Sequence, residues 1–319
     1  MAELVRLLVT GATGKVGRAL VDRLQGTCEI RALCHNRSLD VDGVESVFGS
    51  IADRDAVRQA MAGVTHVVHL ATCKETPDEI MDVAVKGLFW LLEEARESPA
   101  FERFVLIGGD AAVGHFVYKH PVPVTETQRH TAYEGCYALS KVLEEVMLEQ
   151  YQIAYGLNST CLRAPWIMDR DDFRYSLSFG TDQFGGPPWR ELVDGDVPEG
   201  AVPLALDADG HPLKRNFVHV SDLVEAIAIA LEHPAALGQT FNICMDEPVD
   251  YQQVADHLAS TRGLPAVKVP TPHHSTWLDN AKAKLLLGWK PKYDTERLID
   301  EAWDYQRSPD DPRIVWYPG

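Results

Sequence analysis

Tyr137 and Lys141 are separated by four positions in a run whose composition predicts a helix, residues 137–151. Residues four apart lie on the same face of a helix. A lysine ammonium beside a phenol favours the phenolate and lowers the pKa of the tyrosine. A tyrosine tuned in this way can exchange a proton with a hydroxyl or carbonyl group. The spacing alone is common in proteins, so a second motif is needed to give it meaning.

Gly11, Gly14 and Gly17 supply that motif, because they follow the first apolar run and open a helical run. The first glycine allows a tight turn, the second lets the backbone approach a pyrophosphate, and the third lets helix and strand pack closely. The N–H groups at the helix N-terminus then face the phosphates. We predict a dinucleotide-binding loop, with an ordinary glycine-rich turn as the alternative. Beside it, Tyr137 would move a proton while hydride moves to or from a nicotinamide.

The residues after the second predicted strand bear on the choice between NAD and NADP. A carboxylate there would bond the ribose 2′-hydroxyl of NAD. The chain has His35, Asn36 and Arg37 instead, and no acid occurs before Asp40. Since Arg37 could meet a 2′-phosphate, we predict an NAD(P) cofactor with a lean to NADP. The alternative is that Arg37 is a solvated loop charge.

The elements that must hold these residues alternate between short β-branched runs and helical runs. This alternation is typical of parallel βαβ units, so we predict an α/β fold with a Rossmann-type doubly wound parallel sheet and a smaller C-terminal substrate-binding lobe. The predicted strands are residues 5–10, 29–34, 66–71, 104–107, 159–163, 216–219 and 241–244. The predicted helices are residues 14–24, 53–62, 80–95, 137–151, 222–231 and 251–261, with two more within 279–305.

The alternation stops after Arg163, where residues 165–215 are rich in Pro, Gly, Asp and aromatic side chains. We therefore assign residues 1–165 and 216–245 to the dinucleotide-binding domain. Residues 166–215 and 246–319 are assigned to the substrate lobe.

Composition narrows the class of protein. The 319 residues are 45% hydrophobic and carry 47 acidic against 30 basic side chains, a formal net charge of −17. A chain this acidic is a poor candidate for binding nucleic acid or an anionic membrane surface. We see no apolar stretch of the roughly 20 residues that a membrane helix needs, and no signal peptide. The six cysteines are scattered and include no CxxC pair, so we expect no metal site and a cytoplasmic protein.

Together these motifs resemble the extended short-chain dehydrogenase/reductase family, in its NAD-dependent epimerase/dehydratase branch. The resemblance covers nearly the whole chain. The segments that carry it are Thr10–Gly17, His69–Ala71, Tyr137–Lys141, Leu162–Pro165, Arg215–Asp222 and Leu278–Pro291.

The resemblance implies where the cofactor and the substrate bind. Cofactor contacts are expected from Gly11, Thr13, Gly14, Lys15, Val16, Gly17, His35, Asn36, Arg37, Ser50, Ile51, Leu70, Ala71, Thr72, Tyr137, Lys141 and Pro165. Substrate contacts are expected from Lys74, Gly109, Asp110, Trp166 and Arg215. Several of these residues also have a purely structural alternative. Thr72 and Lys74 could belong to a solvated loop, and Asp110 could cap a turn. Trp166 could pack in the core of the lobe, and Arg215 could form an ion pair.

Three positions depart from the family pattern. Gly109 stands where the family usually has a Ser or Thr whose hydroxyl holds the substrate oxygen. Ser50 replaces an Asp, and Ala84 replaces an Asn. A donor to replace the hydroxyl could be Thr72, a protonated Asp110, Thr125, Thr131 or an ordered water.

The sequence thus predicts an NAD(P)-dependent oxidoreductase or epimerase that transfers hydride at a carbinol carbon of a sugar or nucleotide-sugar-like substrate. Tyr137 is the acid/base and Lys141 its partner. The alternatives are a simple NADP-dependent carbonyl reductase or dehydrogenase, and a non-catalytic NAD(P)-binding sensor. We also expect a homodimer, because residues 80–95 and 137–151 carry more apolar positions than one sheet face needs, and family members often pair these helices.

Overall fold

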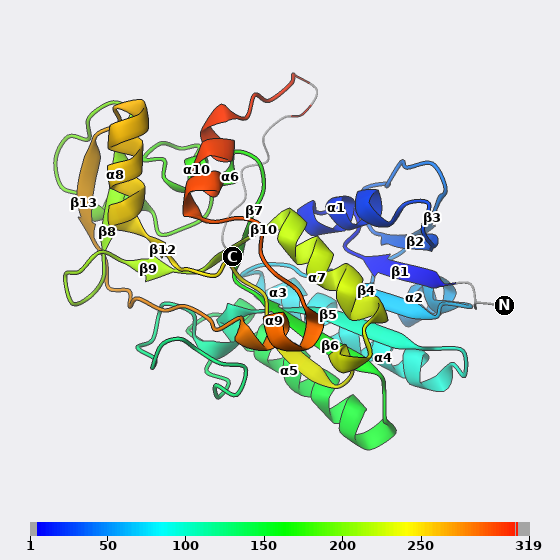
Figure 1. The fold of residues 1–319 in the computed structure, drawn as a ribbon. Helices are drawn as coiled ribbons and strands as arrows, with labels where there is room; N and C mark the ends of the chain where they lie inside the picture. Colours follow the sequence, from blue (N-terminus) through cyan, green and yellow to red (C-terminus); the bar gives the residue numbers. More distant parts are fainter. Residues whose placement is uncertain (1–4, 310, 312–319) are drawn as a thin grey trace.

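The computed structural model describes residues 5–309 and 311, and its centre is a parallel sheet of seven strands in the order β11-β6-β5-β4-β1-β2-β3 (Figure 1). Every neighbouring pair in the sheet runs parallel. The strands are β1 (Arg6–Thr10), β2 (Glu29–Cys34), β3 (Val44–Phe48), β4 (His66–His69), β5 (Arg103–Gly109), β6 (Ser159–Ala164) and β11 (Gln239–Asn242). The predicted α/β fold class is confirmed.

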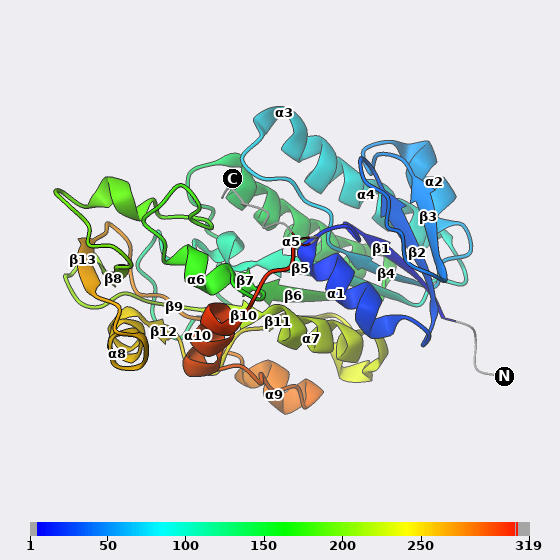
Figure 2. The same cartoon turned by 90° about the horizontal axis from the view of Figure 1, so that it is seen from above.

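Helices cover both faces of this sheet, as Figure 2 shows from above. One face is covered by α1 (Lys15–Leu24) and α7 (Val220–Glu232), and the other by α2 (Arg54–Met61), α4 (Gly87–Glu97) and α5 (Cys136–Tyr155). The chain leaves β1 toward β2 on one side and returns to β4 on the other. Ligands of doubly wound sheets bind at this reversal, outside the carboxyl ends of the strands.

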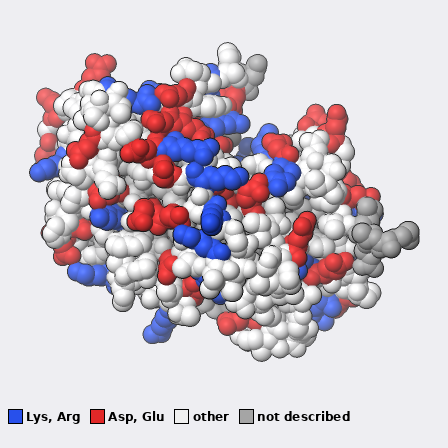
Figure 3. Space-filling model, in the orientation of Figure 1, with Lys and Arg blue, Asp and Glu red and all other residues white. Residues whose placement is uncertain are grey.

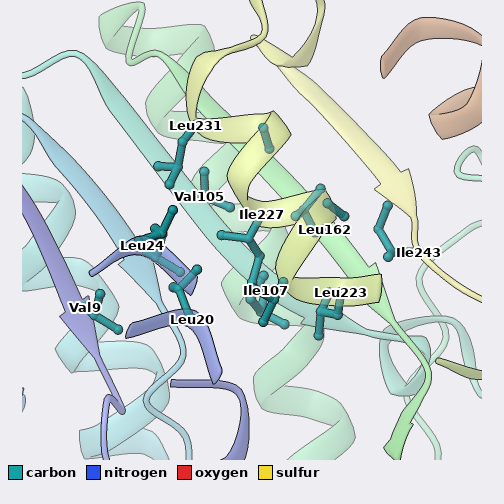
Figure 4. Packing of buried hydrophobic residues seen from close by; sticks show 14 of the residues in the cluster. Val9, Leu20, Leu24, Val105, Ile107, Leu162, Leu223, Ile227, Leu231 and Ile243 are labelled. Atoms are coloured by element: carbon teal, nitrogen blue, oxygen red, sulfur yellow. The ribbon is translucent and has the colours of Figure 1, made fainter. Parts of the chain in front are cut away.

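The face under α1 and α7 has a continuous hydrophobic core (Figure 4). Val9 and Ile107 project from the strands, and Leu20, Leu223 and Ile227 meet them from the two helices. Leu20, Val21 and Leu24 form one apolar stripe along α1, and this stripe packs into the core. Burial of the stripe fixes the N-terminus of α1 beside the end of β1.

The smaller lobe lies to the left in Figure 1 and has its own core around Trp189, Phe173 and Tyr251. Within the described residues it contains short two-stranded sheets, three α-helices and a 3-10 helix over Trp189–Leu192. The sheets and α-helices are β7 (Trp166–Met168) with β10 (Phe217–His219), β8 (Val202–Leu206) with β13 (Ala266–Pro270), β9 (Lys214–Arg215) with β12 (Val249–Asp250), α6 (Asp172–Ser176), α8 (Tyr251–Arg262) and α10 (Thr295–Asp304).

The last segment of the chain returns to the sheet domain. Ala283 and Leu287 of α9 (Ala281–Leu287) and Trp289 pack into the core under α7. The Trp289 indole donates a hydrogen bond to the carbonyl of Asp222 on α7, at 2.9 Å. Residues 246–319, assigned above to the lobe, thus contribute to both cores. Phe217, assigned above to the dinucleotide-binding domain, packs in the lobe core, and the exact division into domains stays a prediction. Parts of both predicted domains lie outside the described residues, namely residues 1–4, 310 and 312–319.

Some elements differ from the expectation. The predicted helix over residues 80–95 is α3 (Pro77–Ile80), then a π-helical turn over Met81–Lys86, then α4. The strand β3 was not predicted, because Glu45 and Ser46 interrupt its apolar residues at the edge of the sheet. The pair β8 and β13 was not predicted because it joins segments about 60 residues apart.

Charges of both signs are mixed on the face drawn in Figure 3, so the net negative charge forms no single acidic field there. None of the helices within residues 5–309 combines the length and the apolar composition that a membrane crossing needs.

Candidate active site

The glycine loop joins β1 to α1 in a shape that requires glycine at two positions. Gly11 has a φ of +66°, and a Cβ there would lie 2.9 Å from the backbone nitrogen of Ala71. A Cβ on Gly17 would overlap the carbonyl oxygen of Gly11. Gly14 is the N-cap of α1 and, within the described part of the chain, no side chain caps this helix. The first N–H groups of α1 are therefore available to phosphate oxygens, and the loop fits a dinucleotide.

Lys15 extends from this loop to the lobe. Its Nζ donates to the carbonyl oxygen of Ile167 at 3.0 Å and forms an ion pair with Asp172 at the start of α6. Thr13 and Val16 are half-buried in the loop. The predicted cofactor residue Lys15 thus also connects the two parts of the molecule.

The residues expected near the adenosine end divide into an exposed and a buried set. His35, Asn36 and Arg37 follow β2 and are exposed. Ser50 is half-buried, and its Oγ accepts from the backbone N–H of Ala52 at 3.2 Å. Ile51 is buried in the core on the α2 and α4 face.

Strands β1 and β4 are tied together at the sheet reversal by Thr10. Its hydroxyl accepts from the N–H groups of Leu70 and Ala71, at 3.1 and 3.2 Å, and lies 2.8 Å from Nδ1 of His69. Because the hydroxyl oxygen accepts both amides, its hydrogen is free to donate to Nδ1. Burial, with the nearby charge of Lys141, lowers the pKa of His69 to about 3, so the ring is neutral. The backbone of Leu70 and Ala71 is thereby fixed beside Gly11.

Tyr137 and Lys141 lie in the first turns of α5, and a second lysine joins them. The Nζ of Lys141 is 5.8 Å from the centre of the Tyr137 ring, and the Nζ of Lys74 is 4.3 Å from it. Lys74 comes from the loop after β4, where Thr72 is exposed and donates its hydroxyl to the Cys73 carbonyl at 3.1 Å. The structure therefore brings the predicted substrate residue Lys74 onto the face of the predicted acid/base.

The start of α5 is capped from the same loop. The carboxylate of Glu75 accepts from the backbone N–H groups of Cys136 at 2.7 Å and Tyr137 at 3.3 Å. A carboxylate at a helix N-terminus is favourable for hydrogen bonding and for the helix dipole. Glu75 is a site residue that the sequence did not reveal, because it lies 61 residues from the helix it caps.

Lys141 is held by a buried acid one turn further along α5. Its Nζ donates to Oε2 of Glu144 at 2.7 Å, and the Lys141 and Glu144 side chains are 6% and 0% exposed. Burial lowers the pKa of Lys141, but Glu144 and Tyr137 outweigh burial, and the pKa is raised overall.

The pKa of Tyr137 is also raised, in contrast to the expectation from Lys141 alone. Burial is the largest cause; Lys141 lowers this pKa as expected, and Glu144 raises it. Within the protein alone, the phenol is therefore the favoured form.

A second buried ion pair fixes α5 to the sheet. Glu145 accepts from Nη2 of Arg163 on β6 at 2.7 Å, and Nε2 of His130 lies 3.0 Å from the same carboxylate. Burial raises the pKa of Glu145, but His130 and Arg163 outweigh it and lower the pKa. The helix that carries Tyr137 is thus anchored at its start by Glu75 and in its middle by Arg163.

Gly109 ends β5 beside these groups. A Cβ there would lie 3.8 Å from the Ala164 carbonyl oxygen and 4.0 Å from Cδ of Lys141, which are ordinary contacts. The expected hydroxyl is absent although a side chain would fit. Among the suggested replacement donors, Thr125 shares a hydrogen bond with Thr127, and Thr131 donates to the Arg129 carbonyl.

Asp110 and Arg215 are joined through His115. Arg215 donates to Nε2 of His115 at 3.0 Å, so the ring proton is on Nδ1, which faces Asp110. The guanidinium carbon of Arg215 lies 4.7 Å from the centre of the Trp166 ring and also packs on Phe116 and Phe217. Pro165 follows β6 and is buried. Asp110, Trp166 and Arg215 thus meet where the lobe joins the sheet domain.

The arrangement combines a phosphate-binding helix terminus with a phenol flanked by two ammonium groups at the carboxyl edge of a parallel sheet. Such a phenol can give or take a proton at a substrate oxygen. Comparison with known proteins is consistent with this chemistry.

A protein of similar fold is a short-chain dehydrogenase/reductase superfamily protein from Agrobacterium tumefaciens, whose structure holds NAD. The two sequences are 27% identical, and the superposition covers 93% of this chain and 95% of that protein with a TM-score of 0.82. L-arabinose 1-dehydrogenase (NAD(P)(+)) of Haloferax volcanii is 27% identical over 241 residues, which are 69% of this chain and 90% of that enzyme. UDP-glucose 4-epimerase of Halalkalibacterium halodurans is 24% identical over 340 aligned positions, covering 94% of this chain and 95% of that enzyme.

The sequence profile of the NAD dependent epimerase/dehydratase family matches residues 7–168, just over half of the chain, from β1 through the glycine loop and Tyr137 to β7. This chain belongs to the NAD dependent epimerase/dehydratase family, whose related members are NAD-dependent epimerases and dehydrogenases.

Proposed function

We propose that the protein is an NAD(P)-dependent oxidoreductase or epimerase that acts on a carbinol carbon of a sugar or nucleotide-sugar-like substrate. The observation that carries the proposal is the position of Tyr137, with Lys141 and Lys74 near its ring, at the strand edge that also holds the glycine loop. The related sugar dehydrogenase and sugar-nucleotide epimerase support the substrate class.

The cofactor would be held by Gly11–Gly17 at its pyrophosphate, and by Lys141 at a ribose hydroxyl. When bound, the nicotinamide supplies a hydride acceptor or donor. Tyr137 takes the proton of the substrate hydroxyl at its Oη during oxidation, and returns it during reduction. Lys141 stabilises the phenolate form that this exchange requires.

The net reaction could be epimerisation, dehydration, or a simple oxidation or reduction by an NADP-dependent carbonyl reductase or dehydrogenase. Epimerases and dehydratases regenerate their cofactor within one turnover and keep it bound, whereas a simple dehydrogenase releases it. Denaturing the purified protein and identifying the released dinucleotide separates the two groups.

The activity itself is tested with nucleotide sugars, free sugars and sugar acids, following NAD(P)H absorbance for net redox and product chromatography for epimerisation. Turnover on one substrate that disappears in the Tyr137→Phe protein supports the proposal. Binding of dinucleotide without turnover on any of them would favour the alternative of a non-catalytic sensor, which Gly109 alone favours.

We also propose a preference for NADP over NAD. Arg37 is exposed after β2, and no acid stands beside it before Asp40. A guanidinium there can pair with a 2′-phosphate. Titration with each dinucleotide measures the preference.

Finally, we propose that α4 and α5 pair with their copies in a homodimer. Apolar side chains on these helices are exposed to solvent: Phe89 at 37%, Leu139 at 43%, Val146 at 36%, Ile153 at 68% and Tyr155 at 58%. An apolar patch on two adjacent helices is typical of an interface. Sedimentation at micromolar concentration should show a dimer, and a species of only 35.4 kDa would contradict it.

A further inference from the structure

Glu144 is a carboxylate at the centre of the site that the proposed chemistry does not use. Its side chain has no exposed surface, and its Oε2 accepts the hydrogen bond from Lys141. Its other oxygen, Oε1, is buried without a hydrogen-bond partner among the residues that the structure describes. A buried carboxylate costs several kcal/mol unless it is paired, so its single partner is important for its stability. That partner is the lysine beside the proposed acid/base.

Titratable groups surround Lys141 from α5, from β4 and the loop after it, from the end of β5 and from β6. Glu144 and Glu145 lie on α5, but Glu145 is already paired with Arg163 and His130. The other titratable groups facing this cluster are His69, Cys73, Lys74 and Glu75 from β4 and its loop, Asp110 after β5, and Cys161 on β6. His69 is neutral and Glu75 accepts from the α5 backbone. Glu144 is therefore the acid in direct contact with Lys141; burial raises its pKa and Lys141 lowers it, with burial the larger cause.

The ammonium of Lys141 favours the phenolate of Tyr137, whereas burial, the largest cause, favours the phenol. Glu144 opposes Lys141, because the charge of Glu144 raises the pKa of Tyr137 while that of Lys141 lowers it. A proton carrier that works in both directions needs the phenol and the phenolate to be close in free energy. The Glu144 hydrogen bond also restricts where the Lys141 ammonium can lie.

We propose that Glu144 is a positioning residue, which fixes the Lys141 ammonium next to Tyr137 and offsets part of its positive charge. This inference rests on the proposed function of Tyr137 and Lys141. Glu144 acts on Tyr137 through its charge, and on the position of Tyr137's partner and of the cofactor through its hydrogen bond to Lys141. Its charge and its position as a hydrogen-bond acceptor have separate effects, so two variants can distinguish them.

The Glu144→Gln variant keeps an acceptor of the same shape and removes the charge. The pKa of Tyr137 should fall by about one unit, since Lys141 is no longer offset. Affinity for NAD⁺ should stay within about threefold of wild type, because Lys141 keeps its partner. The Tyr137 titration is isolated as the difference in phenolate absorbance between each protein and the same protein carrying Tyr137→Phe. Calorimetry measures NAD⁺ binding.

The Glu144→Leu variant removes charge and acceptor together. It should show the same fall in the Tyr137 pKa, and in addition NAD⁺ should bind about tenfold more weakly, as expected for loss of an interaction with a charged group. The matched control is Glu149→Gln, an exposed acid on the same helix, which should change neither measurement. If the leucine variant does not fold, the glutamine variant decides through the titration.

An unchanged Tyr137 titration in a folded Glu144→Gln protein would overturn the inference and leave Glu144 as a structural counter-ion. Neither measurement uses turnover. If the Tyr137→Phe protein is inactive and the titration does not move, only this inference fails. If that protein is active, the proposed function fails instead.

Discussion

The ammonium group of Lys74 lies 4.3 Å from the centre of the Tyr137 ring, closer than the ammonium of Lys141 at 5.8 Å. Lys74 is 63 positions before Tyr137 in the chain, in the loop after β4. Burial, with the charges of Lys141 and Lys15, lowers the pKa of Lys74 to about 7. The site therefore changes its charge near neutral pH through a residue outside the Tyr–Lys motif.

Replacement of Lys74 by methionine should stabilise the free protein in a pH-dependent manner. The pKa of Lys74 is lowered from 10.5 to about 7 by folding, so between these values the unfolded chain binds more protons and wild-type stability rises with pH. Below pH 7 both states are protonated and the full cost of the buried charge remains. Lys74→Met should thus raise the free energy of unfolding by up to about 5 kcal/mol below pH 7, the equivalent of the fall in the Lys74 pKa, and the gain should shrink toward pH 10.5.

The measurement is the melting temperature across this pH range without dinucleotide. Lys268→Met, at an exposed position on β13, is the control and should show no such trend. A gain that is independent of pH would mean that the Lys74 ammonium is solvated in solution.

The Tyr137→Phe protein should bind dinucleotide with unchanged affinity and lose turnover by about 10² to 10⁴, the usual contribution of a general acid or base. Tyr155→Phe, an exposed tyrosine near the end of the same helix, is the control. Steady-state kinetics on a confirmed substrate gives the ratio. Near-wild-type turnover would remove Tyr137 from the mechanism.

Replacement of Lys141 by methionine should weaken dinucleotide binding and move the pH–rate profile to higher pH, because the charge that lowers the Tyr137 pKa is lost. It should also destabilise the fold by roughly 3–5 kcal/mol, because Glu144 is left as an unpaired buried charge. The double variant Lys141→Met/Glu144→Gln should recover part of that stability. An unmoved profile with normal binding would show that Lys141 acts elsewhere.

The Arg37→Ala protein should bind NADP about tenfold more weakly and NAD with little change, because a guanidinium pairs with the 2′-phosphate and not with a hydroxyl. Titration of both dinucleotides measures the two affinities. If wild type binds NAD more tightly, then His35 or Asn36 contacts a 2′-hydroxyl and the proposed preference is wrong.

A serine at Gly109 should be accepted by the fold but should not improve catalysis. The new Cβ meets neighbouring atoms at 3.8 Å or more, so the free energy of unfolding should change by less than about 1 kcal/mol. We expect no gain in kcat/KM on the natural substrate, because the side chain occupies volume that the substrate uses. A gain of tenfold or more would indicate a degraded site and favour the sensor alternative.

The sequence predicted the parts of the structure that depend on local spacing. Gly11, Gly14 and Gly17 identified the loop, and the helical run over residues 14–24 predicted α1, because each pattern lies within one short segment. Tyr137 and Lys141 were found for the same reason, being one turn apart on a helix.

The remaining site residues depend on contacts between distant segments. Glu75 meets the start of α5 across 61 positions, and Lys74 reaches Tyr137 from the same loop. Glu144 is only three positions from Lys141 in the sequence. Acids are common on helix surfaces, however, and this spacing does not reveal that the Glu144 side chain is buried. That burial follows from how α5 packs on the sheet.

The Glu75 cap has a consequence for engineering this protein. One loop carries Lys74 to the ring of Tyr137 and Glu75 to the first backbone amides of α5. An insertion or deletion within residues 72–76 would therefore shift an ammonium group and the end of the helix in the same step. Libraries that aim at a new substrate should keep the length of this loop constant and vary side chains around it.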